Sequence, residues 1–138
     1  MSYSVKQLGI YLHLARASDQ RRRPLVRDRL LILAGAIAAE IDLDAVAAYC
    51  RHQVLLHNPH HLLRQWPTLT AALNTEDFRC HLSQLFRRYP QEKAEQMLES
   101  LGIQLANERD TYFSDFEYAA AILGTTPDAL DEQFGQSE

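Results

Sequence analysis

The chain has 138 residues, of which 46% are hydrophobic, and its formal net charge at neutral pH is −4. This length suits a single domain with a real core, and the apolar share excludes an intrinsically disordered chain. No apolar run approaches the roughly 20 residues that span a bilayer, so we expect no membrane segment.

The charge is distributed unevenly along the chain. Residues 1–30 carry a net charge of +5, residues 31–89 are balanced, and residues 90–138 carry −9. The two ends are therefore electrostatically complementary, and they can meet within one chain or between two chains. An acidic C-terminal third would repel a phosphate backbone, which makes nucleic acid an unlikely partner.

Helical signals begin at the N-terminus, and strand signals are nearly absent. Residues 4–17 are predicted to form a helix that is apolar on more than one face, as in a helix buried in a core or shared with a partner. Pro24 suits the first turn of a second helix, whose apolar residues follow the helical repeat as far as Ile41. A third helix is predicted to begin near Asp42, a plausible N-cap, almost directly after the second.

A proline and a threonine mark the next two predicted helices. Asn58 is a good N-cap and Pro59 a good first helical residue, so a short helix is predicted from there to about Trp66. Thr75 then caps a helix that carries one apolar stripe.

The last three predicted helices have equally local signals. Pro90 opens a helix that Gly102 is predicted to end. The sequence SDFE at residues 114–117 is a capping box, and Thr126 with Pro127 repeats the cap-plus-proline signal. The sequence therefore predicts an all-α fold: one domain over residues 1–138, an irregular array of seven or eight helices, several of them short. Residues 135–138 are predicted to fray.

Four of the six histidines fall within residues 52–61. A transition-metal site needs three or four converging ligands, and none of the common metal-binding spacings is present. The simpler interpretation is a helix junction. The alternative is a zinc or iron site built from His57, His61 and a third ligand, either His81 or Cys80.

Three consecutive arginines, Arg21, Arg22 and Arg23, precede the second predicted helix. One hypothesis makes them an anion-binding patch. The alternative is a solvated turn whose arginines pair with the acidic C-terminal third. No aromatic residues interleave with them, which argues against a nucleic-acid surface.

The chain has two cysteines, Cys50 and Cys80. Two cysteines do not make a disulfide framework, and in a reducing compartment both are predicted to be buried thiols. The N-terminal stretch lacks a signal-peptide pattern, so we expect a cytoplasmic protein.

The absence of catalytic motifs favours a protein without enzymatic activity, although a site assembled from scattered residues stays open. The favoured hypothesis is a non-enzymatic interaction or assembly module without a cofactor. It would bind another protein or, preferably, itself as a homodimer, with Leu8, Tyr11 and Leu12 as the interface. The two alternatives are a metal- or small-ligand-binding helical protein that uses residues 52–61, and a DNA-binding regulator.

Overall fold

The computed structural model describes residues 3–105 and 107–135. These residues form one all-α body with eight α-helices and two 3₁₀ helices, which confirms the predicted fold class. The α-helices are α1 (Val5–Gln20), α2 (Pro24–Glu40), α3 (Asp44–His57), α4 (Leu69–Leu73), α5 (Glu76–Arg88), α6 (Gln91–Ser100), α7 (Asp115–Ile122) and α8 (Pro127–Phe134). The 3₁₀ helices are η1 (Leu62–Gln65) and η2 (Glu108–Thr111). Within the described residues, no helix combines the length and the apolar character that crossing a bilayer requires.

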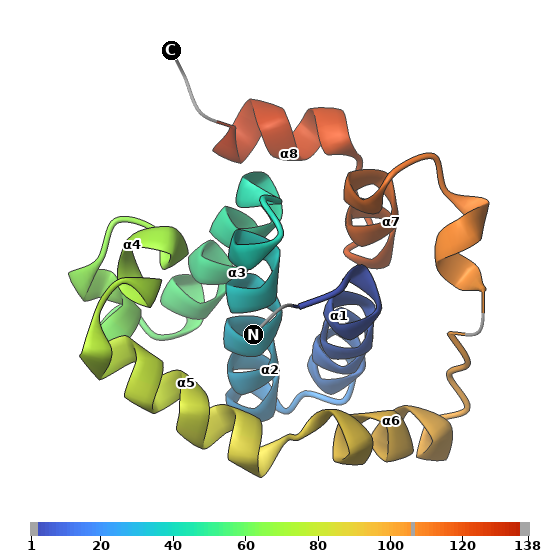
Figure 1. Cartoon of the computed structure of the whole chain (residues 1–138), viewed down its shortest axis with the longest axis horizontal. Coiled ribbons are helices and arrows are strands. Elements are labelled where there is room, and N and C mark those ends of the chain that lie inside the picture. Colours follow the sequence, from blue (N-terminus) through green and yellow to red (C-terminus); the bar gives the residue numbers. More distant parts are fainter. Residues whose placement is uncertain (1–2, 106, 136–138) are drawn as a thin grey trace.

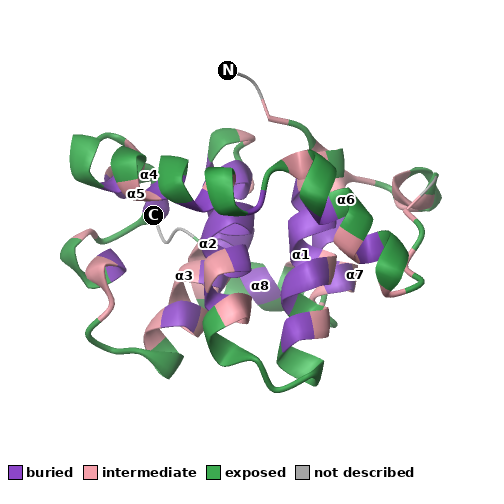
Figure 2. Cartoon of the chain, turned by 90° about the horizontal axis from the view of Figure 1, so that it is seen from below, coloured by how far each residue is buried: buried purple, intermediate pink, exposed green. Residues whose placement is uncertain are grey.

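The centre of the fold is α2. Every residue from Leu30 to Ala39 is buried, so this part of the helix has no face toward solvent. Helices α1 and α3 pack on it along their lengths, and α4 and α5 cover a further side. Helices α6 and α7 pack on α1, and α8 packs on α3, so that the later helices surround the first three (Figure 1). Figure 2 shows the buried residues gathered in α1 and α2.

Helix α1 is apolar on more than one face because it lies between α2 on one side and α6 and α7 on the other. The exposed fractions of Leu8, Tyr11 and Leu12 are 0%, 1% and 0%. The hydroxyl of Tyr11 donates a 2.6 Å hydrogen bond to the carbonyl of Tyr89, inside the chain's own core. These three side chains are therefore not available as the predicted dimer interface. The chain's own later helices, rather than a partner, cover them.

Two glycines let neighbouring helices approach closely. A Cβ built on Gly9 of α1 would lie 2.4 Å from the hydroxyl oxygen of Tyr118 in α7. A Cβ on Gly35 of α2 would lie 2.5 Å from Leu69 Cδ1 and 3.0 Å from Cys50 Cβ. Both positions are helical, so their glycines serve packing rather than backbone freedom.

Helices α1 and α2 are each followed by a left-handed residue that is not a glycine. Arg22 has φ 58° and Asp42 has φ 65°. Each sits in a Schellman-type turn, in which Arg23 N–H donates to Ser18 O and Leu43 N–H to Ala38 O. Asp42 is therefore a residue of the turn and not the predicted N-cap, and α3 begins at Asp44.

The prediction of a helix from Asn58 to Trp66 is wrong in part. Asn58 ends α3, and its side-chain oxygen accepts a hydrogen bond from the backbone N–H of His60. That local side-chain bond competes with helix formation. The chain turns and forms only the short η1, whose N-cap is His61. Helix α4, which begins after Thr68, was not predicted at all.

The remaining caps agree with the sequence prediction. Thr75 and Thr126 accept hydrogen bonds from the backbone N–H three residues on, and Gly102 has φ 75° at the end of α6. Ser114 caps α7 in the same way, but Glu117 accepts from the backbone N–H of Phe113 instead of Ser114. The capping box is therefore half formed. Of the predicted frayed segment, only Gly135 is described, and residues 136–138 lie outside the described residues.

We predict that Gly9→Ala destabilises the fold by about 1–3 kcal/mol, because the added methyl group overpacks the α1–α7 contact. Helix propensity alone would change the stability by about 1 kcal/mol in the opposite direction. Thermal and urea unfolding measure the sign of the change in the free energy of unfolding. Adding Tyr118→Phe removes the oxygen nearest to the new Cβ and should recover part of the loss. A Gly9→Ala variant that unfolds at a higher temperature than the wild type would contradict this contact.

Candidate interaction surface

One end of the molecule combines positive charge with exposed apolar side chains. Its residues come from the turn between α1 and α2, from the start of α2, and from the end of α3 with the turn that follows it. We call this surface the basic end, and it consists of Arg21, Arg22, Arg23, Leu25, Leu56 and His60, all of which are exposed.

Two contacts between α2 and α3 bring these segments to the same end. Asp28, near the start of α2, accepts a 2.5 Å hydrogen bond from Nδ1 of His57 at the end of α3. Arg27 donates from Nη2 to the carbonyl oxygen of Gln53, over 3.4 Å. Since α2 and α3 run antiparallel, the start of one lies beside the end of the other. The α1–α2 turn joins the same end through its connection to Pro24 (Figure 2).

The three arginines of the basic end have no ion-pair partner within the described part of the chain. The ion pairs that join the basic first helix to the acidic last third are Lys6–Glu95 at 3.9 Å and His13–Glu108 at 2.8 Å. The alternative interpretation, in which the arginine turn pairs with that acidic third in the same chain, is therefore not what the structure shows. The charge of this turn faces solvent.

Among the described residues, three large hydrophobic side chains are strongly exposed, and two of them lie at the basic end. Leu25 is 66% exposed and Leu56 is 62% exposed. The third is Phe113, at 94%, in the connection between η2 and α7. Single exposed leucines are ordinary on a protein surface. Two of them beside three unpaired arginines form a mixed apolar and charged surface of the kind found at protein interfaces.

The structure brings together two of the three histidines of the metal hypothesis. The rings of His61 and His81 lie 6.0 Å apart between centroids, in an edge-to-face arrangement. His57 instead points its Nδ1 at Asp28. Among the described residues, no group of three or more histidine, cysteine, aspartate or glutamate side chains could hold a metal ion.

The hydrogen bond of His61 also works against metal binding. Its Nδ1 accepts from the backbone N–H of Leu63, so the neutral ring carries its proton on Nε2. Burial lowers the pKa of His61, and the neighbouring His81 lowers it further. Burial likewise lowers the pKa of His81, whose buried Nε2 has no hydrogen-bond partner among the described atoms. Burial thus favours the neutral form of both rings, and the buried Nε2 of His81 has no partner among the described atoms.

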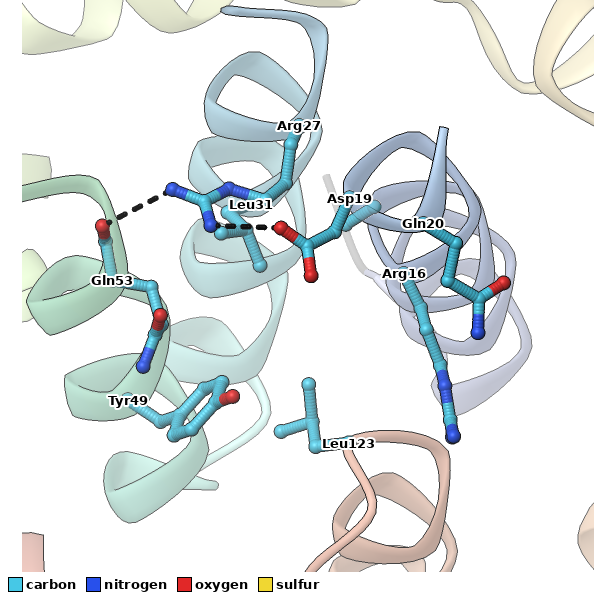
Figure 3. A pocket seen from close by; sticks show the side chains of 9 residues that line it. Arg16, Asp19, Gln20, Arg27, Leu31, Tyr49, Gln53 and Leu123 are labelled. Atoms are coloured by element: carbon cyan, nitrogen blue, oxygen red, sulfur yellow. Dashed lines mark hydrogen bonds and ion pairs between the residues drawn. The ribbon is translucent and has the colours of Figure 1, made fainter. Parts of the chain in front are cut away.

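A polar pocket of about 300 Å³ lies between α1, α2 and α3, close to the basic end (Figure 3). Arg16, Asp19 and Gln20 reach it from α1, and Arg27 and Tyr49 reach it from α2 and α3. None of these residues was singled out in the sequence as a pocket residue, because they come from three different helices and have no motif spacing. Only the fold brings them together.

The two cysteines have different environments. Cys50 is completely buried, as predicted, and burial raises the pKa of its thiol to about 12. Cys80 is exposed on α5, so the prediction that both thiols are buried is wrong. Position 80 lies two residues from both Phe78 and Leu82, which places it on the opposite face of the helix from the apolar stripe. That periodicity was the available signal.

Comparison with protein-family models, with curated proteins and with solved structures finds no match to the chain.

We predict that Arg22→Gly stabilises the protein by about 0.5–1 kcal/mol. A left-handed residue with a Cβ costs about 1–2 kcal/mol, part of which the greater freedom of glycine in the unfolded chain offsets. Arg21→Gly is the matched control, because it removes the same charge at a residue with φ −89°. The control should unfold at a lower temperature than the wild type. Equal shifts of the unfolding temperature in both variants would show that the change in stability comes from the lost charge and not from backbone geometry.

We predict that one thiol per folded chain reacts with a maleimide or disulfide reagent at pH 8. A pKa of about 12 leaves almost no thiolate on Cys50 at that pH, and the side chain is inaccessible. Mass spectrometry after digestion should place the modification on Cys80, and Cys80→Ser should abolish it until denaturant is added. Rapid modification of Cys50 in the native protein would contradict the buried position.

Proposed function

We propose that the chain is a non-enzymatic interaction module that self-associates, with the basic end of one copy bound to the acidic helices of another. The observation that carries the proposal is the basic end itself, where Arg21, Arg22 and Arg23 face solvent without ion-pair partners beside Leu25 and Leu56. Such a surface fits a partner that offers carboxylates around an apolar contact.

The C-terminal third of the chain carries exposed acids on two helices, α6 and α8, which lie on opposite sides of the molecule (Figure 1). Three exposed glutamates, Glu92, Glu95 and Glu99, project from α6, and α8 adds further exposed acids. The exposed acids of α8 are Asp128, Asp131 and Glu132. A twofold dimer would make the contact between basic and acidic surfaces twice, which doubles its contribution relative to a single encounter.

The expected contribution of each charge pair is small. Exposed ion pairs contribute about 0.2–1 kcal/mol each, and salt screens them over about 8–10 Å. The two leucines add apolar contact that salt does not screen. Self-association through this surface should therefore weaken as salt rises, without being abolished.

The test compares two triple variants by sedimentation velocity at low and moderate salt. Arg21, Arg22 and Arg23 changed together to Gln should weaken self-association about tenfold and remove most of its salt dependence. The matched control changes Arg64, Arg87 and Arg88 to Gln, which removes the same charge from exposed positions on η1 and α5. The control should associate like the wild type, apart from a small general charge effect.

Leu56→Ser tests the apolar part of the same surface. It should weaken association at every salt concentration, because the lost contact is not electrostatic. A wild-type chain that stays monomeric at low salt and at its highest soluble concentration would contradict the proposal. Tight, salt-dependent binding of duplex DNA that is lost in the arginine triple variant would instead favour the DNA-binding alternative.

A further inference from the structure

The pocket between α1, α2 and α3 has an apolar floor and a charged rim. Ala15 and Leu31, which are buried, and Leu123, which follows α7, form the floor. Arg16, Asp19 and Tyr49 lie around the opening. Figure 3 shows Asp19 and Tyr49 directed toward the same space, whereas the Arg16 side chain runs along its edge and ends beside Leu123. A cavity of about 300 Å³ is at the small end of the range for ligand pockets, which limits the ligand to a small molecule.

The guanidinium of Arg27 already donates hydrogen bonds to other groups of the protein. Its Nε and Nη2 donate to the buried carboxylate of Asp28, over 3.3 and 3.0 Å. Its Nη1 donates to Asp19 over 3.1 Å, and Nη2 also reaches the carbonyl of Gln53. Arg27 therefore positions Asp19 at the pocket and has little capacity left for a ligand.

Arg16 and Asp19 keep unused hydrogen-bonding groups. One Nη1 N–H of Arg16 donates to the carbonyl of Ile122 over 2.7 Å, which holds the guanidinium at the rim. Its other N–H groups have no partner among the described residues. Asp19 accepts from Arg27 through Oδ1 only, and its side chain is 63% exposed, which leaves Oδ2 free. The two residues are three apart on α1 and so lie on one face.

Tyr49 supplies a neutral donor between the two charges. Its hydroxyl has no hydrogen-bond partner among the described residues and points into the pocket (Figure 3). Burial raises the pKa of Tyr49, so the hydroxyl stays protonated near neutral pH.

The charged residues that line the pocket are Arg16, Arg27 and Asp19. Asp28 lies outside the lining and neutralises Arg27, so the remaining charges, on Arg16 and Asp19, sum to zero. A simple anion would meet Arg16 but be repelled by Asp19, and a simple cation would have the reverse difficulty. A zwitterion satisfies both, with its carboxylate on Arg16 and its ammonium on Asp19. We propose that this pocket binds a free α-amino acid with a small apolar side chain, which would lie on Ala15, Leu31 and Leu123.

The test is isothermal titration of the full chain with three probes of similar size. L-Leucine carries both charges, 4-methylpentanoate lacks the ammonium group, and 3-methylbutylamine lacks the carboxylate. Leucine should bind at least about tenfold more tightly than either single-charge analogue, as expected when one charged hydrogen-bonding group loses its partner.

Variants assign the two charges separately. Arg16→Gln should reduce leucine affinity about tenfold without weakening the binding of the amine, because Arg16 repels a cation. Asp19→Asn should reduce leucine affinity by as much without weakening the binding of the carboxylate analogue, because Asp19 repels an anion. Arg64→Gln, which lies outside the pocket, is the control and should bind leucine like the wild type. Leucine and 4-methylpentanoate binding equally well would overturn the proposal, as would no heat from leucine at millimolar concentration. Self-association plays no part in this result, so the two proposals can fail independently.

Discussion

The fold depends on the complete burial of the middle of α2. A helix without a polar face cannot lie on a surface, so other elements must cover it on all sides. Small residues make this possible, because Ala34, Gly35 and Ala38 let neighbouring helices come close. Helices α1 and α3 take two sides, and the short α4 with α5 takes a third. The array around α2 is irregular because helices of unequal length enclose one apolar helix (Figure 1).

The polar start of α2 sets the chemistry of the surface at that end. Asp28 is the one charged residue that is buried within the described part of the chain, and it is held by Arg27 and His57. A buried carboxylate without such partners would be strongly destabilising. Satisfying it fixes the start of α2 against the end of α3. The same contact determines where the arginine turn, Leu56 and the small polar pocket lie relative to one another. Both proposed activities therefore depend on one buried charge.

The sequence predicted the elements with local signals better than the sites. Thr75 and Thr126 act through hydrogen bonds to nearby backbone, and Pro24 and Gly102 act through their own backbone angles. Their positions could therefore be read directly from the chain. The turns at Arg22 and Asp42 could not, because a left-handed residue with a side chain has no compositional mark. The prediction of a dimer interface on α1 was wrong for a different reason. An excess of apolar residues shows that a helix will be covered, but it does not show by what.

The sites were harder to predict because they depend on contacts between distant residues. The histidine cluster is conspicuous in the sequence, yet its members point to different partners in the fold. The pocket of Arg16, Asp19 and Tyr49 is inconspicuous in the sequence and forms only when three helices pack.

The enclosed segment of α2 also bears on how the protein opens and closes. Amide protons on Leu30 to Ala39 can meet solvent only when the surrounding helices separate, so their exchange reports the opening of the whole body. Helices α1, α2 and α3 follow one another along the chain, so this nucleus closes with short loops. Helices α7 and α8 join it across a large sequence separation. Because they pack mainly on α1 and α3 and not on α2, we expect that the last two helices can detach without exposing the centre. Amide exchange should then be slow in the centre and faster in the outer layer.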